Sequence, residues 1–99
     1  MATDAPISGG VTTVLGGLGA TQLSPIKTPC RQLSIRSHVG NSEMSIGDLK
    51  VAPGTRWAFI LEGETWSLGP FQPGIGIRPC DIYLIGGTLE AVTWVGIHS

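Results

Sequence analysis

Glycine and proline interrupt nearly every apolar run of this chain, and this spacing limits its possible folds more than any other feature. The 99 residues include 15 glycines and 7 prolines. Interior glycine costs a helix backbone entropy, and interior proline removes a hydrogen-bond donor and clashes with the preceding turn. No stretch long enough for an amphipathic helix keeps apolar residues at i, i+3, i+4 and i+7 without such a breaker. The chain is therefore predicted to be all-β.

Short runs rich in Val, Ile, Thr and Trp alternate with turn residues from Cys30 onward. In the run CRQLSIRS, Leu33 and Ile35 share one face, which is typical of a strand buried on one side. Residues 56–63 alternate two apolar sets and are predicted to be buried on both faces. Further strands are expected over 43–51, 65–69, 80–87 and 90–99. About six to eight short strands predict a small antiparallel β-sandwich or barrel over residues 30–99.

The stretch IRSHVGNSEMSIGD, residues 35–48, is predicted to be a β-hairpin. Gly40 and Asn41 both tolerate positive φ, which suits a tight turn between two strands. Further turns between paired strands are expected at Glu62-Gly63-Glu64 and at Gly86-Gly87-Thr88-Leu89. The buried face of the first hairpin would be made by Leu33, Ile35, Met44 and Ile46.

Residues 1–29 form a distinct segment that is small, polar and glycine-rich. It has too few apolar residues for a core of its own, so it is either a flexible arm or an extended strand laid against something else. The spacing of its hydrophobic residues favours an arm that docks on a partner or a neighbouring subunit. These residues are Val11, Val14, Leu15, Leu18 and Leu23.

The composition is apolar for a small soluble protein. Hydrophobic residues make up 41% of the chain and charged residues only 13%. Small monomers normally depend on a charged surface for solubility, and large exposed apolar patches usually mark contacts. We therefore expect a protein partner to cover part of the surface. Trp57 and Trp94 are expected in the core, whereas Trp66, Phe71 and Ile75, in and around the proline-rich loop 70–79, are candidate contact residues.

Charge and hydropathy exclude several other partners. The net charge is −1, and the 6 basic residues are scattered along the chain. This gives no electrostatic footprint for nucleic acid and no polybasic patch for an anionic membrane. The start, MATDAPISGG, lacks the regions of a secretory signal, and no apolar run approaches the roughly 20 residues that span a bilayer. We expect the chain to be made in a cytoplasm and to leave it only within a larger assembly.

Side chains able to do chemistry are few and lie at predicted turns. His38, beside Gly40-Asn41, is expected to be an ordinary turn residue. Glu62 and Glu64 are a candidate carboxylate pair, although exposed carboxylates beside a turn glycine are commoner. A metal site needs at least three converging ligands, and the spacing suggests none. We therefore expect no enzyme, no metal and no cofactor.

Two cysteines, Cys30 and Cys80, each follow a proline and precede a predicted strand. Their separation does not match a zinc motif. Buried reduced thiols are the first interpretation for a cytoplasmic product. A Cys30–Cys80 disulfide is the alternative, and it requires the two strand starts to be neighbours.

From Cys30 onward, the sequence resembles a family of small bacteriophage virion proteins that are often encoded among head genes. The resemblance covers about 70 of the 99 residues and rests on turn and strand features. These features are CRQLSIRSH opening a strand, Asn41 at a turn, MSIGD ending a strand, the Pro53-Gly54 step, the strand IYLIGG and the closing strand AVTWVGI.

The resemblance implies a capsid decoration (cement) protein or a head-fibre component with a small β-sandwich or barrel. Such a protein would bind the major capsid protein on the outer surface of a phage head, as a homotrimer, through its arm and loops. Its location would be the virion. Two alternatives remain open: a glycan- or receptor-binding β module with Trp66 and Phe71 as its platform, and a small tail or baseplate component.

Overall fold

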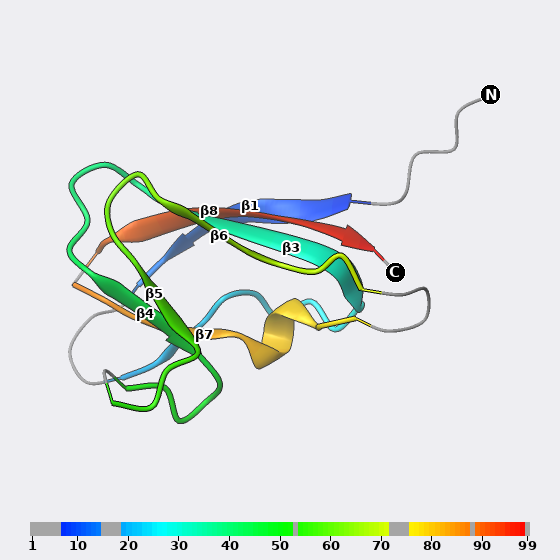
Figure 1. Cartoon of the computed structure of the whole chain (residues 1–99), viewed down its shortest axis with the longest axis horizontal. Coiled ribbons are helices and arrows are strands. Elements are labelled where there is room, and N and C mark those ends of the chain that lie inside the picture. Colours follow the sequence, from blue (N-terminus) through cyan, green and yellow to red (C-terminus); the bar gives the residue numbers. More distant parts are fainter. Residues whose placement is uncertain (1–6, 15–18, 53, 72–75, 88, 99) are drawn as a thin grey trace.

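The computed structural model describes residues 7–14, 19–52, 54–71, 76–87 and 89–98, which form two packed antiparallel sheets (Figure 1). Sheet I contains, in spatial order, β1 (Ile7–Thr13), β8 (Ala91–His98), β3 (Cys30–Ser37) and β6 (Thr65–Leu68). Sheet II contains β2 (Thr21–Gln22), β7 (Tyr83–Ile85), β4 (Met44–Gly47) and β5 (Ala58–Ile60). A short 3₁₀ helix, η1 (Pro79–Asp81), precedes β7. The predicted all-β sandwich is confirmed.

The two sheets have matching strand orders, and this defines the topology. Sheet I runs β1-β8-β3-β6 and sheet II runs β2-β7-β4-β5, so each strand has a sequence neighbour at the same place in the other sheet. Among consecutive strands of the described chain, only β4 and β5 are neighbours within one sheet. Eight strands connected in this way form a jelly roll, a double-sheet arrangement of two Greek keys.

The predicted hairpins are wrong, because the chain changes sheet at each of those turns. Residues 35–48 lead from β3 in sheet I to β4 in sheet II. Gly40 does adopt the expected left-handed conformation, with φ of +96°. A turn residue fixes only the local reversal of the chain, however, and leaves open which strands pair. β3 pairs with β6 and β8 instead.

The core lies between the sheets and draws on both. Leu33 and Ile35 of β3 are buried on one side, and Met44 and Ile46 of β4 are buried on the other. The four residues predicted to share one hairpin face are therefore all buried, but they approach the core from opposite sheets. Full burial of an aliphatic side chain contributes about 1.5–3 kcal/mol relative to exposure. The remaining core residues are Val14, Leu23, Cys30, Ile60, Ile82, Leu84, Val92 and Trp94.

The predicted boundary at residue 29 does not separate two units. β1 pairs with β8 along its whole length, from Ile7 opposite Ile97 to Thr13 opposite Ala91. Val14 and Leu23 are buried in the core of the same chain rather than presented to a partner. The segment has too few apolar residues for a core of its own, and two of them, Val14 and Leu23, belong to the main core.

None of the helical structure in the described part of the chain has the length and hydrophobicity needed to cross a membrane.

Candidate interaction surface

The surface of the sandwich offers contact area rather than a concave site. The described residues form no pocket, and they contain no group of three or more His, Cys, Asp or Glu side chains able to hold a metal ion. The features that stand out are apolar side chains on the outer faces of both sheets.

One apolar group, which we call the β5 row, consists of Trp57, Phe59 and Leu61. Their exposed fractions are 49%, 48% and 46%. Side chains alternate along a strand, so the intervening Ile60 points into the core and the row points outward. The prediction that this segment is buried on both faces is wrong, as is the core assignment of Trp57. β5 is an edge strand of sheet II, and Trp57 and Leu61 directly flank it.

Arg56 holds the middle of the β5 row against the sheet. Its guanidinium carbon lies 4.3 Å from the centroid of the Phe59 ring. The same group donates hydrogen bonds to the Glu43 carboxylate and to the Ser45 hydroxyl, at 2.5 and 3.2 Å. Ser45 is buried and lies directly opposite Phe59 in the sheet. Cation–π contact at an exposed site is worth about 0.5–1 kcal/mol, so the ring is pre-ordered with a cation over one face.

A second apolar group, the β1 strip, lies on the outer face of sheet I and consists of Ile7, Val11 and Val95. Their exposed fractions are 64%, 64% and 48%. The other half of this face is polar, since it is formed by β3 and β6, where the Ser34 and Ser67 hydroxyls lie 3.0 Å apart. Sheet I therefore presents an apolar half beside a polar half.

Three carboxylates fasten the loops at one end of the sandwich. Glu62 accepts a hydrogen bond from the Gly40 amide, 2.6 Å away, and links the β5–β6 and β3–β4 connections. Glu64 accepts one from the Leu61 amide at 2.7 Å within its own turn. Glu62 and Glu64 are thus occupied by separate backbone amides, so the structure does not bring them together as a catalytic pair.

Glu90 makes the most hydrogen bonds of the three. It accepts from the Ser42 amide and hydroxyl and from the Gly87 amide, and so ties the β3–β4 connection to the β7–β8 connection. Partial burial acts to raise the pKa of Glu90, but these hydrogen bonds outweigh it and the pKa lies below its ordinary value. The exposed Val39 and Leu89 lie on the same two connections.

The structure places some of the predicted contact residues against the core and others at the surface. Trp66 lies opposite Ile35 and packs against the core, so it is not an exposed anchor. Phe71 is half-buried, and its backbone amide donates to the Arg31 carbonyl at 2.7 Å. Val11 is exposed within the β1 strip. Three further candidates, Leu15, Leu18 and Ile75, lie outside the described residues.

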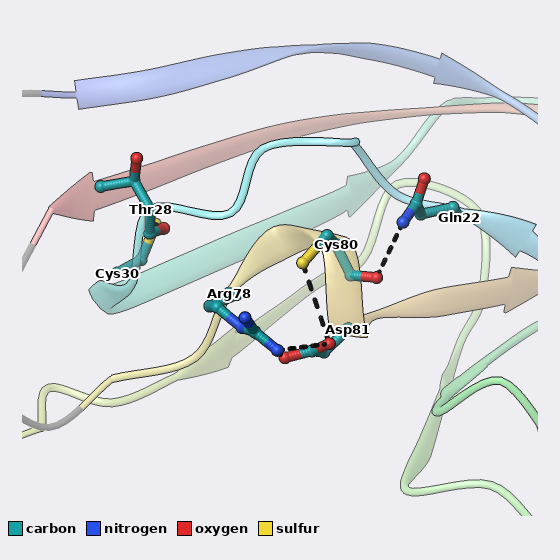
Figure 2. Close-up of polar contacts among 6 residues, drawn as sticks. All are labelled: Gln22, Thr28, Cys30, Arg78, Cys80 and Asp81. Carbon is teal, nitrogen blue, oxygen red and sulfur yellow. Dashed lines mark hydrogen bonds and ion pairs between the residues drawn. The ribbon is translucent and has the colours of Figure 1, made fainter.

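Both cysteines are free thiols, so the disulfide alternative is not realised (Figure 2). Cys30 is buried, lies opposite Ile77, and has its sulfur 3.8 Å from the Thr28 carbonyl oxygen. Burial raises the pKa of the Cys30 thiol, which keeps it protonated. Cys80 is half-buried in η1, with its sulfur 3.8 Å from the Asp81 carboxylate. Figure 2 shows the two thiols on separate segments, each beside a different oxygen acceptor.

His38 continues the β3–β8 ladder rather than forming a site. Its amide donates to the Ala91 carbonyl, and its Nε2 lies 2.6 Å from the Thr93 hydroxyl. No other ionisable group is paired with the ring in the described contacts. The position agrees with an ordinary residue at the end of a strand.

The fold and surface together define a jelly-roll domain with one aromatic-aliphatic row and one aliphatic strip on its outer faces. Comparisons with protein-family models, with curated proteins and with solved structures returned no match.

Proposed function

We propose that this chain is a structural virion protein, a capsid decoration protein that binds the major capsid protein through the β5 row. The observation that carries the proposal is the exposed row of Trp57, Phe59 and Leu61 on an edge strand and the two residues that flank it. Aromatic side chains held rigidly at a surface are typical anchors of protein interfaces, because little side-chain entropy is lost when they are covered. The apolar composition and the resemblance to phage virion proteins support the same role.

The jelly-roll topology agrees with this role by analogy only. Jelly rolls occur in viral capsid proteins, but they also occur in lectins and in other binding proteins. A decoration protein needs modest affinity at each site, because many identical contacts on a lattice act together through multivalency. A small rigid domain with one well-ordered apolar row meets that requirement.

The glycan-binding alternative is less well supported by the surface. Its expected platform, Trp66 and Phe71, is half-buried. The exposed Phe59 would be the natural replacement, but one face of its ring is already occupied by the Arg56 guanidinium. Sugar stacking requires a free aromatic face, and the guanidinium that lies over this ring is already hydrogen-bonded to Glu43 and Ser45.

The role on the particle is tested by quantitative mass spectrometry of purified virions. A decoration protein is expected at hundreds of copies, on the order of the number of capsomer contacts that it bridges. A handful of copies would indicate a tail or vertex component. Absence from purified particles would overturn the proposal.

The binding surface is tested with the double variant Trp57→Ser/Phe59→Ser in co-sedimentation with particles that lack the chain. We expect binding to fall at least tenfold, because both aromatic anchors are lost. Val39→Ser is the matched control, since Val39 is an exposed apolar residue on the β3–β4 connection and lies outside both the β5 row and the β1 strip. Equal binding by the double variant and the control, or glycan-array binding that is lost in the double variant, would contradict the assignment.

A further inference from the structure

The edge of sheet I formed by β1 is long and unprotected. β1 spans 7 residues, ISGGVTT, with no charged residue and no proline. Within the described chain it pairs on one side only, with β8. Natural edge strands are usually short or carry lysine, proline or a bulge, because an open row of amides and carbonyls is a template for another strand. β1 has none of these devices.

The open hydrogen-bonding groups of β1 can be assigned from its pairing. The Val14 amide donates to the Glu90 carbonyl, 2.7 Å away, which continues the β1–β8 register by one residue. Hydrogen-bonded and non-hydrogen-bonded pairs alternate along an antiparallel ladder. The even-numbered residues therefore bond to β8, and the amides and carbonyls of Ile7, Gly9, Val11 and Thr13 point to the open edge.

The other three edges are poorer templates for a second strand. β2 has 2 residues and β5 has 3, which is too short for a stable ladder. β6 has 4 residues and offers a shorter ladder than β1. β1 is the longest of these edge strands and carries no charged residue.

We propose that two copies of this chain pair through their β1 strands, antiparallel and around a two-fold axis, to form one continuous sheet. An open antiparallel edge is self-complementary under a two-fold rotation. Full overlap of residues 7–13 places Gly10 on the axis and sets Gly9 opposite Val11 of the second copy. This register uses every outward amide and carbonyl of β1 and forms about eight hydrogen bonds between the copies.

The side chains are compatible with this pairing. Gly9 and Gly10 leave the centre of the strand free of bulk, so the two backbones can approach closely. On the outer face, the β1 strips of the two copies become neighbours, and apolar residues of each strip cover part of the other. The pairing does not rest on the proposed virion role, because it concerns a different sheet from the β5 row.

Amide hydrogen exchange of the full chain, followed by NMR, tests the pairing. In a monomer, the amides of Gly9, Val11 and Thr13 face solvent and exchange fast, whereas those of Gly10 and Thr12 are protected. In the proposed dimer all five are protected, and the odd-numbered ones lose protection on dilution. Light scattering after size exclusion should give twice the 10.3 kDa chain mass at the concentrations where that protection is seen.

The variant Val11→Lys is expected to shift the dimer dissociation constant at least tenfold, because it places two like charges beside the axis. Val39→Lys is the control: it adds the same charge at an exposed loop position and should leave the dimer unchanged. Should Val11→Lys fail to fold, Val11→Glu serves in its place, because it also places two like charges beside the axis. A wild-type monomer, a trimer, or a dimer whose Val11 amide exchanges fast would overturn the proposal. The two proposals can fail separately. A variant that no longer self-associates but still binds particles, or one that self-associates but no longer binds particles, shows that the β1 pairing and the proposed function are independent.

Discussion

Gly96 marks a point where two strands approach so closely that a single methyl group decides the packing. A Cβ atom at this position would lie 2.6 Å from the Cys30 sulfur and 3.4 Å from the Cys30 Cβ. Gly96 is itself buried, and Cys30 has no exposed surface through which to move aside. The free thiol therefore fills space that any residue other than glycine at position 96 would need.

The first prediction concerns this pair of residues. Gly96→Ala should destabilise the protein by about 1–3 kcal/mol through overpacking, measured by urea unfolding. In Cys30→Ala/Gly96→Ala, the nearest contact is removed, and the contacts at 3.4 Å with the Cβ of residue 30 and at 3.5 Å with the Trp94 ring remain. The double variant should therefore lose less stability than the sum of the two single variants, with a coupling of about 1 kcal/mol. Simple additivity would show that the sulfur does not limit the space at Gly96.

Residue-level pattern predicted the core better than it predicted the surface. Leu33, Ile35, Met44 and Ile46 were assigned to the buried side by alternation alone, and all four are buried. Trp57 and Trp66 were assigned to the wrong sides, because alternation indicates two faces but not which face is covered. In a short apolar strand such as β5, the covered face is the one on which the other sheet packs, and that depends on the tertiary fold.

At the scale of elements, the segment before residue 30 shows that widely spaced apolar residues can belong to the core of their own domain. Its hydrophobic residues were predicted to dock on another subunit, yet Val14 and Leu23 are core residues and β1 is a strand of sheet I. The spacing of these residues in the sequence does not identify what they pack against. For Val14 and Leu23, the partner is the rest of the same domain.

The second prediction distinguishes a core segment from a docking arm. Leu23→Ala should lower the free energy of unfolding by about 2–5 kcal/mol, because it leaves a cavity where a side chain is 2% exposed. Val11→Ala, in the same segment but exposed, should change it by no more than about 0.5 kcal/mol. Both are measured by chemical denaturation at equal protein concentration. Similar small effects of the two changes would restore the docking-arm interpretation.

The sequence correctly predicts where the chain reverses direction, but it wrongly assigns these turns to hairpins. The sequence predicted a reversal at Gly40-Asn41, and Gly40 does have positive φ. In a jelly roll, such a reversal carries the chain across the core to the other sheet, and strand pairing comes from partners distant in sequence. No local signal separates this connection from a hairpin, because both need the same backbone conformation.

In the molecule as a whole, hydrogen bonds between the loops at one end of the sandwich hold the two sheets together. Glu90 joins two of the connections that pass between the sheets, through the Ser42 and Gly87 amides. Its lowered pKa means that the folded protein favours the ionised form. The stabilisation is present above the pKa of Glu90 in the unfolded chain and is lost as the pH falls through its lower pKa in the folded protein.

The third prediction follows from the lowered pKa of Glu90 in the folded protein. Glu90→Gln should cost about 1 kcal/mol at neutral pH, because a neutral amide accepts weaker hydrogen bonds and solvent screens part of the difference. The stability gap between wild type and variant should narrow as the pH falls below the ordinary value of 4.5. Thermal unfolding followed by circular dichroism across pH 3–7 measures this gap. A gap independent of pH would show that the charge of Glu90 is not involved.

The placement of β1 beside β8 also determines how the domain responds to force. Ile7, at the start of the first strand, lies directly opposite Ile97, near the end of the last (Figure 1). Tension applied between residues 7 and 97 would open this ladder from one end, one pair of strand residues at a time. Tension applied along the strands from opposite ends of the ladder would instead shear many hydrogen bonds together. This pairing therefore resists mechanical stress better when the load shears the two strands than when it enters through residues 7 and 97.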